Sequence, residues 1–170
     1  MDYDRKLYSR GWGQGAQCEI DVHGGTTICK GDLLFLDRVD GLRSRGTSSK
    51  DYYAYPLSDI SGVTLSLVSN ITLASRNFLG VAAWHSDGGV TEKIAVHVNG
   101  LFKYPLKNSR RLKSGATVVP AGSGVTIYSQ KVSVSRSGAS GYIGYVGTSG
   151  TFKNSVEMNI FTLFGGNTDL

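Results

Sequence analysis

The clearest pattern in the chain is an alternation of apolar and polar residues in two separate stretches. Residues 92–98 and residues 155–164 each place an apolar or small side chain at every second position. These positions are Ile94, Val96 and Val98 in the first stretch, and Val156, Met158, Ile160, Thr162 and Phe164 in the second. Successive side chains of a strand point to opposite faces, so a period of two predicts β-strands with one buried face.

Turn-forming residues divide the chain around the first of these strands. Residues 78–82 form a short apolar strand, which Ser86 to Gly89 ends because Asp and Gly favour turns. Asn99-Gly100 is a strong signal for a tight hairpin turn, since both of its central positions need positive φ. We therefore expect a hairpin whose return strand starts at Leu101 and ends at Pro105, which has no N–H to donate.

The rest of the chain is also predicted to consist mainly of short strands and loops. Residues 18–29 are expected to form a hairpin around a turn at His23 to Gly25, and residues 33–36 a fully buried strand. Residues 63–73 favour a strand because their apolar side chains share one parity, although Asn70 as an N-cap would instead start a short helix. The remaining expectations are an exposed loop at 37–51, a basic loop at 108–115, a strand at 116–119 stopped by Pro120, and strands at 125–128, 132–134 and 142–146.

The two halves of the chain show a weak internal similarity. The first half contains GDLLFLD, FLGVA and EKIAVHV, and the second contains SGATVVP, YIGYV and SVEMNI in the same order. This order predicts two related halves that together close one small β-barrel or sandwich. Gly80 and Gly144 occupy the middle of matching strands, where a glycine indicates a bend or a close approach of backbones.

Composition supports an all-β fold. Among 170 residues there are 23 glycines and only 3 prolines, which suits many short strands joined by Gly-rich turns. We expect a small β-barrel or sandwich of short antiparallel strands with at most one short helix. The predicted organisation is an N-terminal arm at 1–17, a β-rich domain at 18–165 and a loose tail at 166–170.

Two aromatic-rich segments are the candidate contact sites. The arm carries Tyr3, Leu7, Tyr8, Arg10 and Trp12 without any period, and such a segment is usually ordered by docking on its own body or on a neighbouring subunit. The second segment holds Tyr52, Tyr53 and Tyr55, which either cap the edge of the core or form an exposed contact patch.

The charge and the two cysteines bear on compartment and partners. A net charge of +5 and a pI near 9.2 permit an acidic partner, but the basic residues are spread over three segments, so we expect no direct binding of nucleic acid. Residues after Met1 are charged and no apolar run is long enough to span a bilayer, which predicts synthesis in a reducing cytoplasm and no membrane association. Cys18 and Cys29 are either cross-strand neighbours or small buried thiols.

No recognisable catalytic or metal-binding motif is present. His23, His85 and His97 lack the spacing of metal ligands, and no nucleophile motif, phosphate-binding loop or pair of carboxylates is visible. Gly11, Gly13 and Gly15 have no strand before them or helix after them, so they do not predict a phosphate site. We expect a protein without cofactor or metal that is not an enzyme.

Four segments, taken in order, resemble the small capsid decoration (cement) proteins of tailed phages. They are GDLL at 31–34, YPLSD at 55–59, FLGVA at 78–82 and GLFKYPLK at 100–107. The resemblance covers roughly residues 28–120 and does not extend to the loop at 38–50 or to the C-terminal half.

This resemblance implies a β-rich protein that binds the outside of an assembled icosahedral shell, commonly as a homotrimer. The implied partners are the major capsid protein and other copies of the chain, and the implied location is the outer surface of the virion. The arm would lie across neighbouring subunits and bury Tyr8 and Trp12. Three alternatives remain open: a virion-surface adhesion module whose tyrosines stack on host glycans, a small enzyme with an unrecognised site whose best candidates are His85 and Asp87, or another structural protein of the head or tail.

Overall fold

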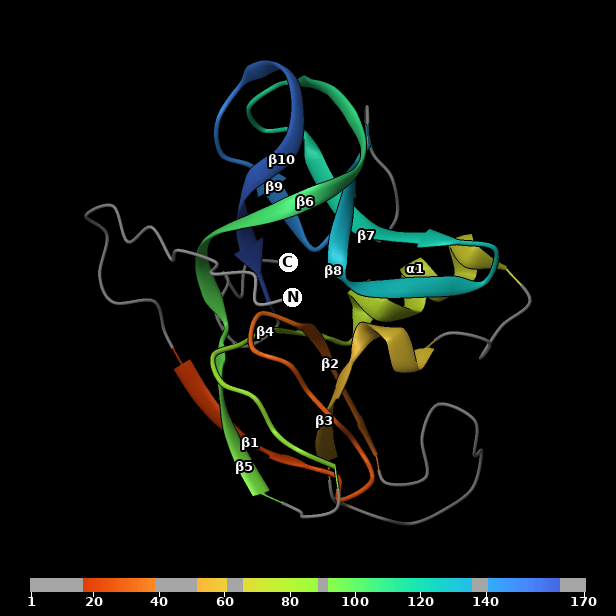
Figure 1. Cartoon of the computed structure of the whole chain (residues 1–170), viewed down its shortest axis with the longest axis vertical. Helices are drawn as coiled ribbons and strands as arrows, with labels where there is room; N and C mark the ends of the chain where they lie inside the picture. Colours follow the sequence, from red (N-terminus) through yellow and green to blue (C-terminus); the bar gives the residue numbers. More distant parts are fainter. Residues whose placement is uncertain (1–16, 39–51, 61–65, 89–91, 136–140, 163–170) are drawn as a thin grey trace.

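The computed structural model describes residues 17–38, 52–60, 66–88, 92–135 and 141–162. These residues form two closed five-stranded β-barrels stacked along the long axis of the molecule (Figure 1). The prediction of an all-β fold is therefore confirmed. The expectation that both halves close a single barrel was wrong, because each half closes a barrel of its own.

Barrel 1 is built by the first half of the chain and barrel 2 by the second. Barrel 1 contains β1 (Gln17–Val22), β2 (Leu33–Arg38), β3 (Tyr52–Pro56), β4 (Phe78–Ala82) and β5 (Glu92–His97). Barrel 2 contains β6 (Asn99–Leu112), β7 (Thr117–Ser123), β8 (Thr126–Val134), β9 (Gly144–Val146) and β10 (Gly150–Phe161). A 3₁₀ turn, η1 (Leu57–Ile60), and the helix α1 (Leu67–Arg76) connect β3 to β4.

The two barrels share one topology. Around barrel 1 the order is β1-β3-β2-β4-β5, and around barrel 2 the corresponding strands follow in the same order, β6-β8-β7-β9-β10. Each barrel also has one parallel pair at the matching place, with Val22 opposite Ala54 and Leu106 opposite Val132. The internal similarity of the sequence thus corresponds to a repeated five-stranded unit.

Gly80 and Gly144 have equivalent structural roles in the two barrels. A Cβ atom on Gly80 would lie 2.2 Å from the carbonyl oxygen of His97, and one on Gly144 would lie 2.2 Å from that of Asn159. Those carbonyls belong to β5 and β10, the matching neighbours of β4 and β9. Gly80 lies in the middle of β4 as predicted, whereas Gly144 is the first residue of β9; at both, as predicted, two backbones approach too closely for a side chain.

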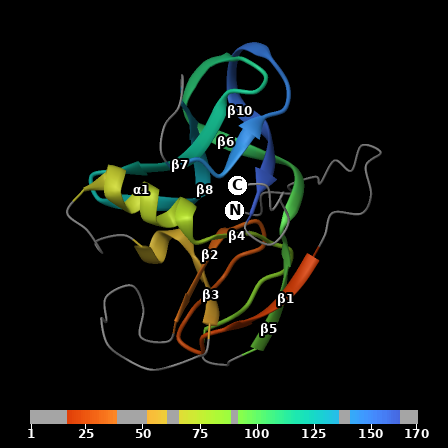
Figure 2. The same ribbon diagram turned by 180° about the vertical axis from the view of Figure 1, so that it is seen from behind.

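The larger hydrophobic core fills barrel 2 and continues onto the outer face of barrel 1. It joins residues inside barrel 2, such as Val132 and Met158, to Leu33 and Phe78, with η1 and α1 packed beside them. A smaller core fills barrel 1 and includes Val22, Leu34, Ala54, Leu79 and Val96. Figure 2 shows α1 beside β7 and β8, at the level where the two barrels meet. Because β2 and β4 bury side chains on both faces, barrel 1 is held against barrel 2 by apolar packing.

The strand predicted at 63–73 was wrong for residues 67–73, because residues 67–76 form α1, while residues 61–65 lie outside the described residues. Ser66, not Asn70, is the N-cap residue, with extended dihedral angles of φ −130° and ψ 127°. Asn70 lies inside the helix, is fully buried, and donates from Nδ2 to the carbonyl oxygen of Val125 at 3.0 Å. The helix is therefore favoured by its packing on the β7–β8 connection, a tertiary contact that local periodicity does not report.

The hairpin predicted at Asn99-Gly100 was also wrong. β5 closes barrel 1, whereas Asn99 begins β6 of barrel 2, where Asn99 and Gly100 lie opposite Phe161 and Ile160. Gly100 nevertheless has a positive φ of 134°, a backbone conformation that residues with a side chain rarely adopt. The chain therefore passes from one barrel to the other at this point instead of turning back.

Neither Pro105 nor Pro120 ends its strand. β6 continues from Pro105 to Leu112, so most of the basic loop predicted at 108–115 is strand, with a turn at 114–115. β7 likewise continues past Pro120 to Ser123. Pairing shifts register between Pro120 and Gly122, and in β10 opposite the segment after Pro105. Irregular pairing of this kind accommodates a residue that cannot donate to the ladder.

Residues 18–29 do not form the predicted hairpin. β1 pairs with β5 and β3, and the returning segment contributes only a single bridge between Ile28 and Ser86. The turn at His23 to Gly25 is present, closed by a 2.9 Å bond from the Thr26 N–H to the His23 carbonyl. Strands predicted at 33–36, 78–82, 92–98 and 155–164 correspond to β2, β4, β5 and β10. Within the described ranges, no helix has the length and apolarity to cross a membrane.

Candidate contact surfaces

The four segments that resemble decoration proteins come together in the structure. GDLL leads into β2, which pairs on one side with FLGVA in β4 and on the other with the first residues of YPLSD in β3. The fourth segment lies in β6 of barrel 2, and its Tyr104 is fully buried with its phenol bonded to the Gly31 carbonyl at 2.7 Å. These four segments form one continuous unit at the junction of the barrels, which we call the waist.

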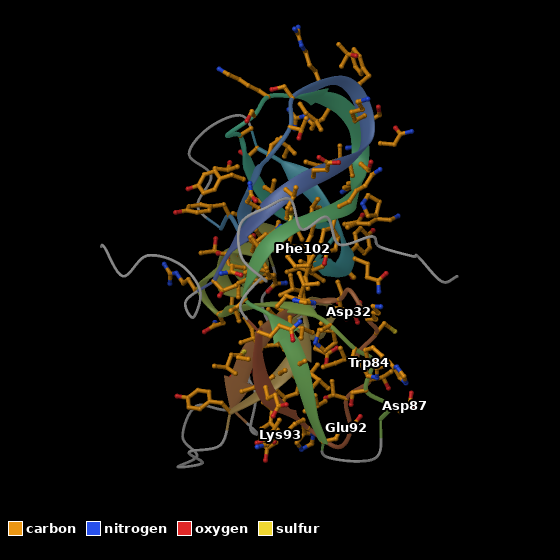
Figure 3. The ribbon with its side chains drawn as sticks, turned by 90° about the vertical axis from the view of Figure 1, so that its left-hand side faces the viewer. Asp32, Trp84, Asp87, Glu92, Lys93 and Phe102 are labelled. Carbon is orange, nitrogen blue, oxygen red and sulfur yellow. The ribbon has the colours of Figure 1, made fainter. Side chains whose placement is uncertain are left out.

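Polar contacts also cross the waist. Asp32, which is buried, accepts hydrogen bonds from the Cys29 N–H at 2.8 Å and from Gln130 Nε2 of β8 at 2.6 Å. Figure 3 shows Asp32 below Phe102, near the level where the two barrels meet. Ser58 of η1 donates its N–H to Ser129 Oγ at 2.9 Å. The bond between Asp32 and Gln130 joins a residue of barrel 1 to one of barrel 2, so it helps to fix how the barrels meet.

The tyrosines of β3 do not form one flat patch. Tyr53 and Tyr55 lie on one face of the strand, and both contact the ring of His23. The His23 ring packs edge-to-face with that of Tyr53, with ring centroids 5.7 Å apart, and stacks with that of Tyr55, with ring centroids 6.4 Å apart. Tyr55 also stacks on Phe35 at 5.6 Å. Tyr52 has the parity of the buried Ala54 and so points to the other face, with its side chain exposed. The structure therefore joins two of the three predicted contact tyrosines, and half-buries both.

The other predicted contact residues, Tyr3, Leu7, Tyr8, Arg10 and Trp12, lie outside the described residues, as does the loop at 39–51. Their roles stay predictions.

The described histidines and cysteines do not come together to form a metal site. Within the described ranges, no three His, Cys, Asp or Glu side chains are placed to hold a metal ion. His97 lies on β5 with Nδ1 at 3.1 Å from Gln17 Nε2, and burial, with a smaller contribution from Lys30, lowers its pKa. Both cysteines are free thiols, and Cys29 is exposed instead of buried as one interpretation expected. Burial raises the pKa of both thiols, and Asp32 and Asp87 add to the effect at Cys29.

Charge is divided unequally between the barrels. Residues 99–162 contain eight Lys or Arg residues and a single acidic residue, Glu157, whereas residues 17–98 contain seven basic and nine acidic residues. The excess of positive charge on barrel 2 thus comes from its shortage of acidic residues, since the numbers of basic residues in the two halves are nearly equal. This division can be read from the sequence once the boundary between the barrels, at residue 98, is known.

Six large apolar side chains are strongly exposed in the part of the chain that the structure describes: Tyr52, Val68, Trp84, Val125, Tyr142 and Phe152. Phe152 has the largest exposed fraction, 79%. Trp84 is 63% exposed on barrel 1, where Lys30 Nζ lies 5.7 Å from the centre of its ring. Tyr142 contacts Tyr145 with their ring centres 5.4 Å apart. None of these except Tyr52 was selected from the sequence, because an exposed aromatic residue is recognised only by its place in the fold.

No protein-family model and no curated protein sequence matches the chain. Among solved structures, the chain is similar to "The crystal structure of head fiber gp8.5 N base in bacteriophage phi29". That similarity covers 85% of this chain and 94% of the other, with 12% sequence identity and a TM-score of 0.44. At this distance the likeness assigns neither fold nor function to the chain.

Proposed function

We propose that the chain is a structural virion protein of a tailed phage that binds the outer surface of the assembled capsid and stabilises it by bridging coat subunits. Its partners in this proposal are the major capsid protein and further copies of itself, as a homotrimer. It carries no catalytic activity and needs no cofactor.

The observation that carries the proposal is the arrangement of the waist. Four short segments resemble those of decoration proteins, and each is unspecific when taken alone. In the fold, three of them are adjacent strands of barrel 1 and the fourth packs on them through Tyr104 and its bond to Gly31. Segments that were matched only by their order in the sequence therefore form one structural unit, as expected if the resemblance reflects a shared body.

The architecture also suits attachment through side chains. Closed barrels leave no long unpaired strand edge, so contacts with other proteins have to come from side-chain surfaces and from segments outside the barrels. The exposed aromatic residues and the basic surface of barrel 2 provide such surfaces. Several modest contacts repeated over a shell add up to firm attachment, so a deep pocket is not required.

Sedimentation with shells tests this proposal. The purified chain would be mixed with empty shells assembled from the coat protein of the same virus, and the bound fraction would be followed to saturation. We expect saturable co-sedimentation and an increase in the temperature at which the shells fall apart. The same shells without the chain, and the chain alone, are the controls.

A glycan-binding screen distinguishes the adhesion alternative. The proposal expects the chain to bind shells and to ignore host glycans. Binding to a defined glycan that is lost in Tyr53→Ala, with no binding to shells, would instead favour an adhesion module.

A further inference from the structure

The end of barrel 2 that points away from barrel 1 carries an unusual combination of side chains. It consists of residues 110–115, where β6 ends, and residues 147–153, where β10 begins, and we call it the distal tip (Figures 1 and 2). Ser114 ties the two segments together, with its N–H bonded to Ser149 Oγ at 2.8 Å and its Oγ to the Gly147 carbonyl at 3.3 Å. The tip is therefore a hydrogen-bonded end of the barrel.

Phe152 occupies a bulge at this tip. Gly150 lies opposite Leu112 and Lys153 opposite Arg110, so that Thr151 and Phe152 together face Arg111. Within the described residues, Phe152 is the only one other than glycine with positive φ, at 21°. A bulky side chain in this conformation is strained. Strained residues persist only where the surrounding structure holds them in place, and they are more frequent at functional sites. The bulge directs an aromatic ring outward where glycine would be the less strained choice.

Several basic residues are close to Phe152 in sequence or in the strand register. Arg111, Lys113 and Lys153 are exposed, and Arg110 is held by a hydrogen bond from its guanidinium to the Val134 carbonyl. There is no acidic residue in either segment of the tip. The tip thus combines one exposed aromatic ring with three exposed cations, while Glu157 of β10 accepts a 3.1 Å hydrogen bond from Thr148 Oγ1 beside it.

We propose that the distal tip is the surface through which the chain grips an acidic protein surface of the shell, with Phe152 seated in an apolar pocket and Arg111, Lys113 and Lys153 facing carboxylates. This inference rests on the proposed function and adds the part of the molecule that faces the coat. Central aromatic anchors and arginines dominate the energy of protein interfaces, and complementary charge guides association.

Nucleic acid is the competing partner for a basic surface with an aromatic residue. Proteins that bind single strands stack successive bases on several aromatic side chains along a basic groove. The described part of the tip offers one ring, while Tyr142 and Tyr145 contact each other. One aromatic side chain flanked by cations can fill a single pocket on a protein, but it cannot stack on several successive bases. The tip therefore suits a protein partner better than a single strand of nucleic acid.

The test compares matched variants of the full chain in shell binding. Phe152→Gly removes the ring at the tip, and Trp84→Ala removes an exposed ring from barrel 1. Arg111→Glu reverses a charge at the tip, and Lys93→Glu makes the same change in net charge at an exposed position of β5, which Figure 3 places toward the far end of barrel 1. Equilibrium co-sedimentation with empty shells would be measured at low and physiological salt, with thermal unfolding of each variant alongside.

We expect both tip variants to bind shells at least about tenfold more weakly and both barrel 1 controls to stay within about twofold of the unchanged chain. Phe152→Gly should unfold at or above the temperature of the unchanged chain, because glycine tolerates positive φ. Binding of the unchanged chain should weaken with added salt, and that dependence should decrease in Arg111→Glu.

Other results overturn the inference in recognisable ways. If the unchanged chain binds shells and the tip variants bind like their controls, the tip is not the contact and the proposed function stands. If the unchanged chain does not bind shells at all, both proposals fail. A fluorescent single-stranded DNA oligonucleotide serves as a further probe, and binding to it at physiological salt that only the tip variants lose would make the tip a nucleic-acid surface instead.

Discussion

The phenol of Tyr104 donates a 2.7 Å hydrogen bond to the carbonyl of Gly31, a residue 73 positions earlier in the chain. Tyr104 belongs to β6 of barrel 2, and Gly31 is the first residue of the GDLL segment that leads into β2 of barrel 1. Tyr104 is fully buried, and its ring packs in the core that the barrels share. This contact joins the two repeated units, as the bond between Asp32 and Gln130 also does, and it links two of the segments that resemble decoration proteins.

Replacing Tyr104 with Phe tests the importance of that bond. The change keeps the ring in the core but takes a donor away from a buried carbonyl, which should lower the free energy of unfolding by about 1–3 kcal/mol. Urea unfolding followed by far-UV circular dichroism measures the difference. Tyr128→Phe, at a half-buried tyrosine near Lys131, is the control and should change stability little. Equal stability in both variants would show that the Gly31 bond is not important for joining the barrels.

Alanine at Gly80 or Gly144 should damage the two barrels in the same way. Either new methyl group would lie 2.2 Å from a backbone carbonyl, and Gly80 also has φ of 148°, which alanine adopts poorly. We expect each substitution to cost about 3 kcal/mol or more, because backbone of a neighbouring strand cannot move aside as a side chain can.

Gly25→Ala is the matched control for these glycines. A Cβ atom there would meet only the His23 ring, at 3.7 Å, which is an ordinary contact. Thermal unfolding should therefore show a small change for Gly25→Ala and a large decrease for the other two. A mild effect at Gly144 alone would mean that β9 is held less tightly than its counterpart β4.

His97 should make the fold sensitive to mild acid. Burial lowers its pKa in the folded state, so the unfolded chain binds the proton more readily. Stability from this group is complete above the unfolded pKa of about 6.5 and decreases as the pH falls below that value. Urea midpoints at a series of pH values should show the decrease, and His97→Gln should reduce it. An unchanged pH dependence in His97→Gln would assign the effect to other groups.

Removing the arm tests its predicted role in attachment. β1 begins at Gln17, whose side chain lies within hydrogen-bond distance of His97, so deletion should stop at residue 16 to keep both barrels intact. We expect the shortened chain to keep its circular dichroism spectrum and to lose saturable binding to shells, because bridging contacts of Tyr8 and Trp12 are removed. Saturation of shells at the original affinity would refute the role of the arm.

The sequence was sufficient where a local rule decides the structure. The alternation at Ile94, Val96 and Val98 marked a strand with one buried face, and the same holds for Val156, Met158 and Ile160. Such a period depends only on the geometry of one strand. The correspondence between Gly80 and Gly144 was visible too, because close approach of two backbones excludes every side chain except that of glycine.

The tertiary structure decided which strands pair and which side chains gather. Asn99-Gly100 favours a turn locally, yet pairing with β10 places both residues in a strand of the other barrel. The apolar residues between 63 and 73 have the parity of a strand, yet packing on barrel 2 and the Asn70 bond favour a helix at 67–76. The concentration of positive charge around Phe152 depends on β6 and β10 being neighbours. The intrinsic preference of a residue for helix, strand or turn is a small free energy that does not depend on where the segment packs. Burial and pairing between distant segments contribute more free energy, and they depend on the whole fold.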